Sequence, residues 1–330
     1  MLGPIPFEVP AKFAGELASG SIVRVGALLK DTGSGQIIAH LQETGLAQNL
    51  LNSAVSSPFS PLQVLNTPSS LLANVQLAQL KSMVEGLQML QFANLGATVA
   101  GIGVSAIGFA LMNKKLNGLQ SQMTTFESRV EERFMQLHER ELRSHYSRIH
   151  GFFNQADQAH SLTNSTAEWL RLSSELSEES VYFRGEVAHL LKSEIFDNDL
   201  FEALTRSYAL CNSGRIECLV LARELPAAQK VSEDVAGDYN RLFDPLIPIQ
   251  LAHKSANLIE NTDDDLLKQE LLGMQNLVGN LRDVQDASSS KPYLMETLIE
   301  REIDGYEYMQ AITNEKEQAF LLIETGEDYK

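Results

Sequence analysis

Cysteine is scarce in this chain of 330 residues, which contains only Cys211 and Cys218. Two cysteines cannot form the disulfide framework on which small secreted proteins depend, so the sequence favours a reducing compartment. In a helix the two residues would share one face at a separation of about 10 Å along the axis, too far apart for a disulfide bridge. We therefore expect both cysteines to be reduced and to lie in a hydrophobic core.

Positive charge is also scarce. Lysine and arginine number 26 against 43 aspartates and glutamates, which gives a net charge of −17 at pH 7. The excess is uneven, because residues 1–112 carry −1, residues 113–150 carry +2 and residues 151–330 carry −18. Since so acidic a region repels phosphate backbones, we expect no nucleic-acid partner.

Catalytic motifs are missing as well. The chain has no Gly-x-Ser-x-Gly nucleophile elbow, no P-loop and no dinucleotide-binding fingerprint. His138 and His145 are seven residues apart, whereas a zinc-protease helix needs two histidines four apart on one face. The acidic run 262–265 is typical of a helix start rather than of a calcium-binding loop. These absences argue against an enzyme, and we expect no cofactor and no metal site.

A secretory leader is not evident at the N-terminus. The first ten residues contain three prolines and neither lysine nor arginine, whereas a signal peptide has a basic start and an uninterrupted apolar stretch. We therefore expect synthesis in the cytoplasm without a signal peptide.

A long uncharged run is the most informative feature that the chain does have. No charged residue lies between Glu85 and Lys114, and residues 92–112 within this run are apolar and rich in glycine, alanine and serine. About 20 such residues cross a bilayer. Small residues recur at four-residue spacing, which lets helices approach closely inside a membrane. The residues that we expect to insert and pack in this segment are Phe92, Gly96, Ala97, Ala100, Gly101, Gly103, Val104, Ser105, Gly108 and Phe109.

Residues 92–112 admit three interpretations. A buried core helix would need a tight packing reason, because each glycine inside a helix costs about 1 kcal/mol relative to alanine. A permanent span would have Lys114 and Lys115 on its cytoplasmic side, and the region before it would have to cross the membrane without a signal. We therefore favour a conditional segment, sheltered in one form of the protein and membrane-associated in another.

A heptad pattern follows this segment. Its a and d positions are Leu116, Leu119, Met123, Phe126 and Val130. After Arg133 the pattern shifts toward Phe134, Leu137 and Glu141. Such a narrow apolar stripe predicts a helix over residues 113–150, which is either an oligomerising coiled coil or one helix of a bundle.

The N-terminal region has the clearest β pattern. Residues 22–25 and 27–29 are rich in β-branched or aliphatic side chains, residues 31–35 form a turn rich in glycine, and residues 36–41 form a returning run of the same kind. This arrangement predicts a hairpin with a long loop. A lone hairpin is marginally stable in water, so it should pack on a helix or pair with another chain.

Together these patterns predict a mainly α-helical protein, a helical bundle with a long central helix and a small N-terminal β-hairpin element. We expect four regions: an α+β element over 1–57, a proline-containing linker over 58–70, a long helical block over 71–150 and an acidic helical domain over 151–330. In the acidic domain Trp169 should lie in the core. The expected breaks between its helices are 212–214, Pro226, 244–248, 261–265 and 288–292.

This organisation resembles that of α-helical pore-forming toxins and of the membrane-acting effectors of bacterial defence systems. The resemblance covers residues 92–112 and the helix through about His150. It implies a homo-oligomer in a lipid bilayer, with the glycine- and alanine-rich helix lining or sealing a pore. We therefore expect a self-associating protein that inserts into or permeabilises membranes through residues 92–112. The alternative is a soluble scaffold or adaptor in which residues 92–112 are buried core and the 113–150 helix binds a protein partner.

Overall fold

The computed structural model describes residues 7–8, 13–25, 28–43, 135–194, 196–256, 264–314 and 320–324. Residues 92–112 and the heptad positions from Leu116 to Val130 lie outside the described residues. Most of the described residues are helical, as the sequence predicts. The chain divides into two compact units, Met1–Ala106 with Glu307–Lys330 and Ile107–Tyr306, which are taken separately below.

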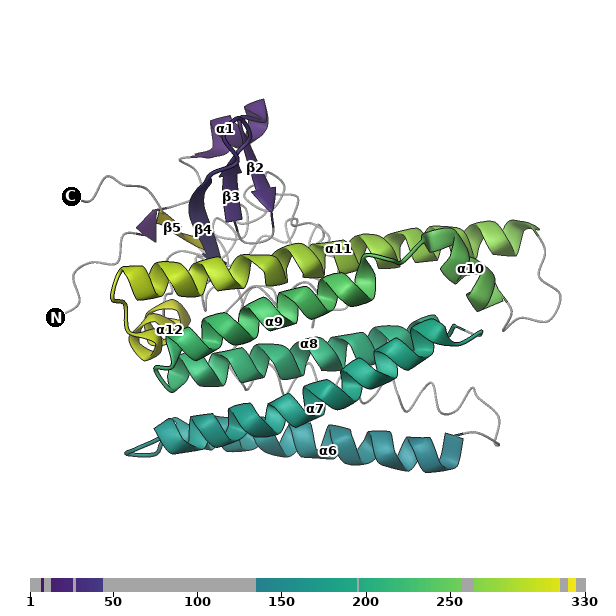
Figure 1. Ribbon diagram of the computed structural model, residues 1–330, viewed down its shortest axis with the longest axis horizontal. Coiled ribbons are helices and arrows are strands. Elements are labelled where there is room, and N and C mark those ends of the chain that lie inside the picture. Colours follow the sequence, from purple (N-terminus) through teal and green to yellow (C-terminus); the bar gives the residue numbers. More distant parts are fainter. Residues whose placement is uncertain are drawn as a thin grey trace, which may run out of the picture. The chain divides into compact units, whose positions relative to one another are not determined.

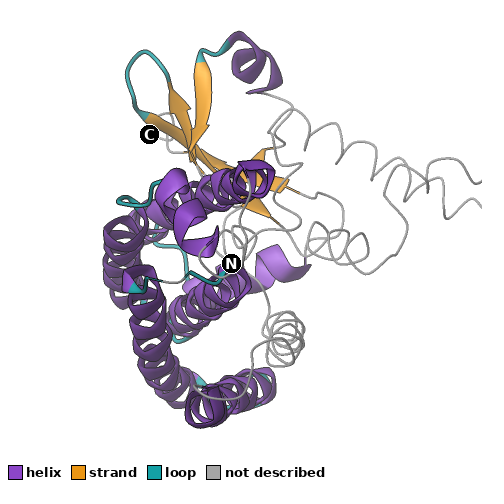
Figure 2. Cartoon of the chain, turned by 90° about the vertical axis from the view of Figure 1, so that its right-hand side faces the viewer, coloured by secondary structure: helices purple, strands orange, loops and turns teal. Residues whose placement is uncertain are grey.

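The first unit contains a five-stranded antiparallel sheet. Its strands are β1 (Phe7–Glu8), β2 (Ile22–Val25), β3 (Leu28–Asp31), β4 (Ile37–Glu43) and β5 (Phe320–Glu324), in the order β1-β5-β4-β3-β2. Figure 2 shows them lying side by side. The N-terminal β element is thus confirmed as the three strands β2 to β4, preceded by the short helix α1 (Ala14–Ser19). The sequence does not predict β5, which pairs with β4 from Glu43 opposite Phe320 to Ala39 opposite Glu324.

The predicted turn between β3 and β4 forms around a local side-chain cap. Asp31 Oδ1 accepts hydrogen bonds from the backbone N–H of Ser34 at 2.7 Å and from its hydroxyl at 2.8 Å. These bonds favour the charged carboxylate and lower the pKa of Asp31. Gly35 then adopts a φ of 72°, which glycine tolerates best.

The second unit is a row of helices, each packed on a neighbour (Figure 1). Its helices are α6 (Met135–Ala159), α7 (Thr166–Lys192), α8 (Asn198–Leu221), α9 (Leu225–Phe243), α10 (Pro248–Ala256) and α11 (Asp264–Glu300). The pairs in extensive contact are α6 with α7, α7 with α8, α8 with α9, α9 with α11 and α10 with α11. The boundary between the two units falls inside α12 (Gly305–Asn314). The helical bundle predicted from the sequence is therefore confirmed.

The core of this row is centred on α8, which is buried along nearly all of its length and on most of its sides. The predicted core residues Trp169, Cys211 and Cys218 are fully buried, and both cysteines are unpaired thiols. Burial raises the pKa of both thiols well above the ordinary value. The two cysteines therefore act as small apolar residues rather than as nucleophiles.

Two of the predicted helix breaks are wrong. Residues 212–214 lie inside α8, and residues 288–292 lie inside α11. At the first position the side chain of Asn212 donates to the hydroxyl of Tyr239 on α9 at 3.3 Å, so tertiary contact holds a helix that local propensity disfavours. At the second position Ser288 and Ser290 are buried in the packed row, and Pro292 is accommodated inside α11.

The other breaks agree with the structure where it describes them. Pro226 stands in the first turn of α9, where its missing N–H leaves no bond unmade. Residues 244–247 separate α9 from α10, which begins at Pro248, and α11 begins at Asp264, inside the acidic run.

Two helices end in left-handed residues that are not glycine. Arg223 (φ 66°) follows α8, with hydrogen bonds from Arg223 N to Val220 O at 3.0 Å and from Glu224 N to Leu219 O at 2.9 Å. This pair of bonds is a Schellman cap. Glu302 (φ 53°) closes α11 in the same way.

Gly305 gives the first test of this packing. A Cβ built on Gly305 would lie 2.7 Å from the carbonyl oxygen of Val220 and 3.1 Å from a methyl carbon of Leu225. We expect Gly305→Ala to lower the free energy of unfolding by about 1–3 kcal/mol because backbone must move to relieve the clash. Gly185→Ala is the control, since a Cβ there meets nothing within 4 Å, and it should be neutral or stabilising by up to about 1 kcal/mol. Urea denaturation of both variants measures the difference, and equal stabilities would contradict the close approach.

Candidate functional site: a charged network between α6 and α7

The candidate site lies on α6, which contains the described part of the predicted long helical block. The predicted membrane residues from Phe92 to Phe109 and the seam residues from Leu116 to Val130 lie outside the described residues. The block continues as α6, which begins at Met135 and ends at Ala159, beyond the predicted boundary at residue 150. The contacts that attach α6 to the helices after it make up the candidate site.

One face of α6 is apolar and buried. The buried residues are Leu142, Tyr146, Ile149, Phe153, Ala156 and Ala159. Their spacing of three and four residues is that of an amphipathic helix. Glu141, which the sequence pattern places in the seam, is exposed instead, because the apolar stripe passes through Leu142. From Met135 onward the predicted 113–150 segment is therefore helical, and within this chain Glu141 lies off the buried apolar stripe.

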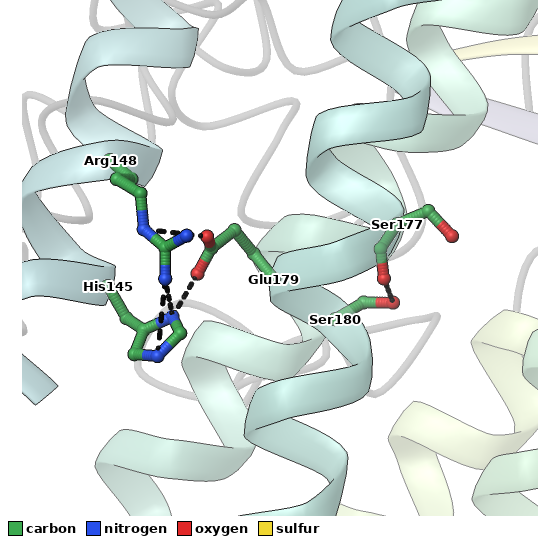
Figure 3. A network of polar contacts seen from close by, with 5 residues as sticks. All are labelled: His145, Arg148, Ser177, Glu179 and Ser180. Atoms are coloured by element: carbon green, nitrogen blue, oxygen red, sulfur yellow. Dashed lines mark hydrogen bonds and ion pairs between the residues drawn. The ribbon is translucent and has the colours of Figure 1, made fainter. Parts of the chain in front are cut away.

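A buried carboxylate joins α6 to α7 at the edge of this apolar face. Glu179 of α7 is only 2% exposed, and its two oxygens contact two residues of α6 (Figure 3). His145 Nδ1 lies 2.6 Å from Oε2, and Arg148 Nε lies 3.1 Å from Oε1. His145 and Arg148 are three residues apart, so they project from the same side of α6.

His145 Nδ1 faces two partners with opposite requirements. Arg148 Nη2 lies 2.7 Å from this nitrogen and 3.3 Å from Nε2 of the same ring. A guanidinium can only donate and a carboxylate can only accept, so Nδ1 cannot satisfy both at once. When Nδ1 carries the proton it donates to Glu179, and Arg148 Nη2 can then donate only to Nε2. When Nε2 carries the proton, Nδ1 accepts from Arg148 and makes no hydrogen bond to Glu179. The network therefore has two alternative hydrogen-bond arrangements on one nitrogen.

Aromatic rings enclose the other side of the imidazole. The ring of His145 stacks on Tyr182 with centroids 3.4 Å apart, and the edge of Phe183 lies beyond it. The buried Tyr182 hydroxyl has no hydrogen-bond partner among the described residues. Burial, followed by the acidic neighbours Glu186 and Glu141, raises the pKa of this hydroxyl. Tyr182 therefore remains a neutral phenol and packs as an aromatic face.

A second polar contact ties α6 to α8. The hydroxyls of Tyr146 and Ser207 are 2.7 Å apart and buried. Ser207 also donates to the carbonyl of Ala203, so Tyr146 is placed to donate to Ser207. Burial raises the pKa of Tyr146 and keeps it neutral. The docked face of α6 thus combines an apolar stripe with two polar attachments.

The network lacks the parts that hydrolytic chemistry needs. A histidine bonded to a carboxylate is the base of a Ser-His-Asp triad, but Ser180, which Figure 3 draws next to Glu179 on α7, donates to the carbonyl of Ser177 at 2.9 Å. Arg148 also occupies the imidazole nitrogens. Among the described residues there is no group of three or more histidines, cysteines or acids that could hold a metal ion. What the described geometry does show is an attachment of α6 to α7.

A buried ionisable pair lies elsewhere in the same unit. Glu217 of α8 is 7% exposed, and burial raises its pKa well above the ordinary value despite the positive charge of Lys291. Burial lowers the pKa of the partly buried Lys291 of α11 to about 8, against the opposing effect of Glu217. Neither shift could be read from the sequence, because both arise from the packing of α8 and α11.

Comparisons with known proteins identify no relative: no protein-family model, no curated protein and no solved structure matches this chain. Within the part of the chain that the structure describes, none of the helices combines the length and the apolar character that a membrane span requires. The function is therefore argued from this chain's own residues.

Lys291 provides a pH-dependent test. Between pH 8 and 10.5 the unfolded chain binds a proton at Lys291 that the native chain does not, so the contribution of Lys291 to stability rises with pH in that range. We expect Lys291→Met to be more stable than the wild type at pH 7 by about 1–2 kcal/mol, with the advantage shrinking by pH 9.5. Urea denaturation at each pH measures this. Ionisation of unfolded cysteines affects both proteins equally and cancels in the difference.

The matched control for that test is Lys268→Met, on an exposed position of the same helix. Its stability difference from the wild type should not change with pH over the same range. A difference for Lys291→Met that is equally constant would show that this lysine is not shifted by burial.

Proposed function

We propose that this protein associates with itself and inserts into or permeabilises a lipid bilayer through residues 92–112. The uncharged run of 28 residues between Glu85 and Lys114 is the observation that carries the proposal. Its length matches a bilayer crossing. Its glycines would destabilise an ordinary soluble helix, whereas in a membrane they permit close contact between helices.

Charge supports the assignment of membrane contact to this part of the chain. Residues 151–330 carry a net −18, so this region is repelled by anionic lipid surfaces. Residues 113–150 carry +2, and Lys114 and Lys115 directly follow the apolar segment. Lysines at this position favour anchoring at the headgroup level. Attraction to a bilayer is therefore concentrated in residues 92–150.

The arrangement of the helices also supports the proposal. The described helices α6 to α11 pack on one another in series, and α6 is the described helix that follows the apolar segment in the chain. A folded acidic body attached to a Gly/Ala-rich segment is the organisation of the α-helical pore-forming toxins and defence effectors that the sequence resembles. By that resemblance, the membrane form is a homo-oligomer.

Flotation with liposomes tests the proposal. Wild-type protein should float with vesicles, and Val104→Arg should not, because an arginine at the middle of a span costs about 2.5–3.5 kcal/mol. The control is Val181→Arg, which adds the same charge at a position of α7 that is 65% exposed. Circular dichroism establishes that each variant is folded.

The outcomes separate the two functions that the sequence allows. Flotation by the wild type and by Val181→Arg, but not by a folded Val104→Arg, supports insertion of residues 92–112. A folded wild type that does not float, or a Val104→Arg that misfolds in solution, favours the soluble scaffold whose 92–112 segment is core. Dye leakage from the same vesicles distinguishes permeabilisation from simple attachment, and Gly101→Leu should reduce leakage if helix packing forms the pore.

A further inference from the structure

We propose that α6 is a second membrane-binding element, which detaches from α7 and lies in the headgroup region of the bilayer, and that Glu179 restrains it until then. This inference rests on the proposed function and adds an element to it. Its three supports are the position of α6 in the row, the composition of its two faces and the ionic nature of its attachment.

The position of α6 makes it separable from the other helices. The only described helix with which α6 has an extensive contact is α7, whereas α7, α8 and α9 each pack against helices on two sides. Detachment of α6 therefore leaves the contacts among α7, α8, α9 and α11 in place. It also frees the helix that lies nearest in the chain to residues 92–112 among the described helices of this unit.

The two faces of α6 have the character of an interfacial helix. The docked face carries large apolar groups, of which Leu142, Tyr146, Ile149 and Phe153 are at most 2% exposed. The outer face carries exposed polar residues, which include Arg143, the half-exposed Arg148 and the acidic Glu141 and Asp157. Helices with an apolar face and arginines on the polar face bind with the apolar face at the boundary between headgroups and acyl chains. Release of α6 would expose that face to the bilayer.

The attachment through Glu179 is suited to release. The charged groups of this contact lose their hydration when α6 docks on α7. This desolvation penalty offsets most of the attraction between them. When α6 leaves, His145, Arg148 and Glu179 are hydrated again, so separating them costs far less than separating an apolar interface of the same size. Substitution of Glu179 has the opposite effect from release of the helix. If α6 stays docked without this carboxylate, the partners of Glu179 remain buried without their counter-charge, and the docked state is destabilised. Replacement of Glu179 therefore destabilises the docked position of α6, whereas the intact contact adds little to the cost of release.

Hydrogen exchange in solution tests the restraint without a membrane. Glu179→Gln should accelerate exchange of α6 amides by at least about tenfold, while α8 amides exchange as in the wild type. The control is Glu178→Gln, which removes the same charge from an exposed neighbour on α7 and should leave α6 unchanged. If α6 exchanges equally in both variants, the restraint is overturned.

A milder variant, Tyr146→Phe, tests the same release if Glu179→Gln does not fold. Tyr146→Phe removes only the hydroxyl that contacts Ser207, and it should accelerate α6 exchange about threefold or more without changing α8. An acceleration spread equally over α6 and α8 would indicate global destabilisation and would overturn selective release.

Fluorescence quenching by lipid tests the membrane location. A polarity-sensitive dye is attached at Gly151→Cys on α6 or at Gly185→Cys on α7, positions where a Cβ meets nothing within 4 Å. The two native cysteines are buried and do not compete for the label. With vesicles containing a shallow lipid-bound quencher, the α6 label should be quenched at least twofold more than the α7 label. Equal or absent quenching at α6, in protein that floats, overturns the inference and leaves insertion of residues 92–112 standing.

The variant Val104→Arg separates the two proposals. Quenching of the α6 label that persists when Val104→Arg is combined with Glu179→Gln supports an independent membrane contact by α6. If neither the wild type nor Glu179→Gln binds vesicles at all, both the proposed function and the membrane role of α6 are overturned.

Discussion

Burial of α8 on most of its sides is the constraint on which the rest of the helical unit depends. A helix surrounded in this way needs neighbours on opposite faces, and α7 and α9 supply them. Burial also affects its polar residues, since it raises the pKa values of Glu217, Cys211 and Cys218 well above their ordinary values. The ionic contacts of α6 lie farther out, at the margin of the row, where water can reach the charges once the helix separates.

The sequence was sufficient for features that depend on near neighbours in the chain. The amphipathic spacing of α6, the proline in the first turn of α9 and the glycine-rich turn before β4 are local patterns, and the structure contains all three. The buried positions of Trp169 and the cysteines follow from residue type alone.

Features that depend on distant contacts were missed. Strand β5 is a short apolar run whose partner β4 belongs to the other end of the chain, and nothing local marks it as a strand. The caps after α8 and α11 use Arg223 and Glu302 where glycine is the usual signal. Glu179 stands in an acidic run that looks like a solvated face, and only the fold brings it against His145 and Arg148. A histidine and an arginine beside an apolar stripe were the signal available in the sequence.

The pairing of β4 with β5 has a consequence for biosynthesis. The row from α6 to α11 is built from contacts between successive helices, so it can form while the chain is still emerging from the ribosome. The sheet cannot be completed in that period, because β4 ends at Glu43 and its partner begins at Phe320. Until β5 is made, the β5-pairing edge of β4 is an open template for another nascent chain. A chaperone that protects this edge would find its binding site only during translation.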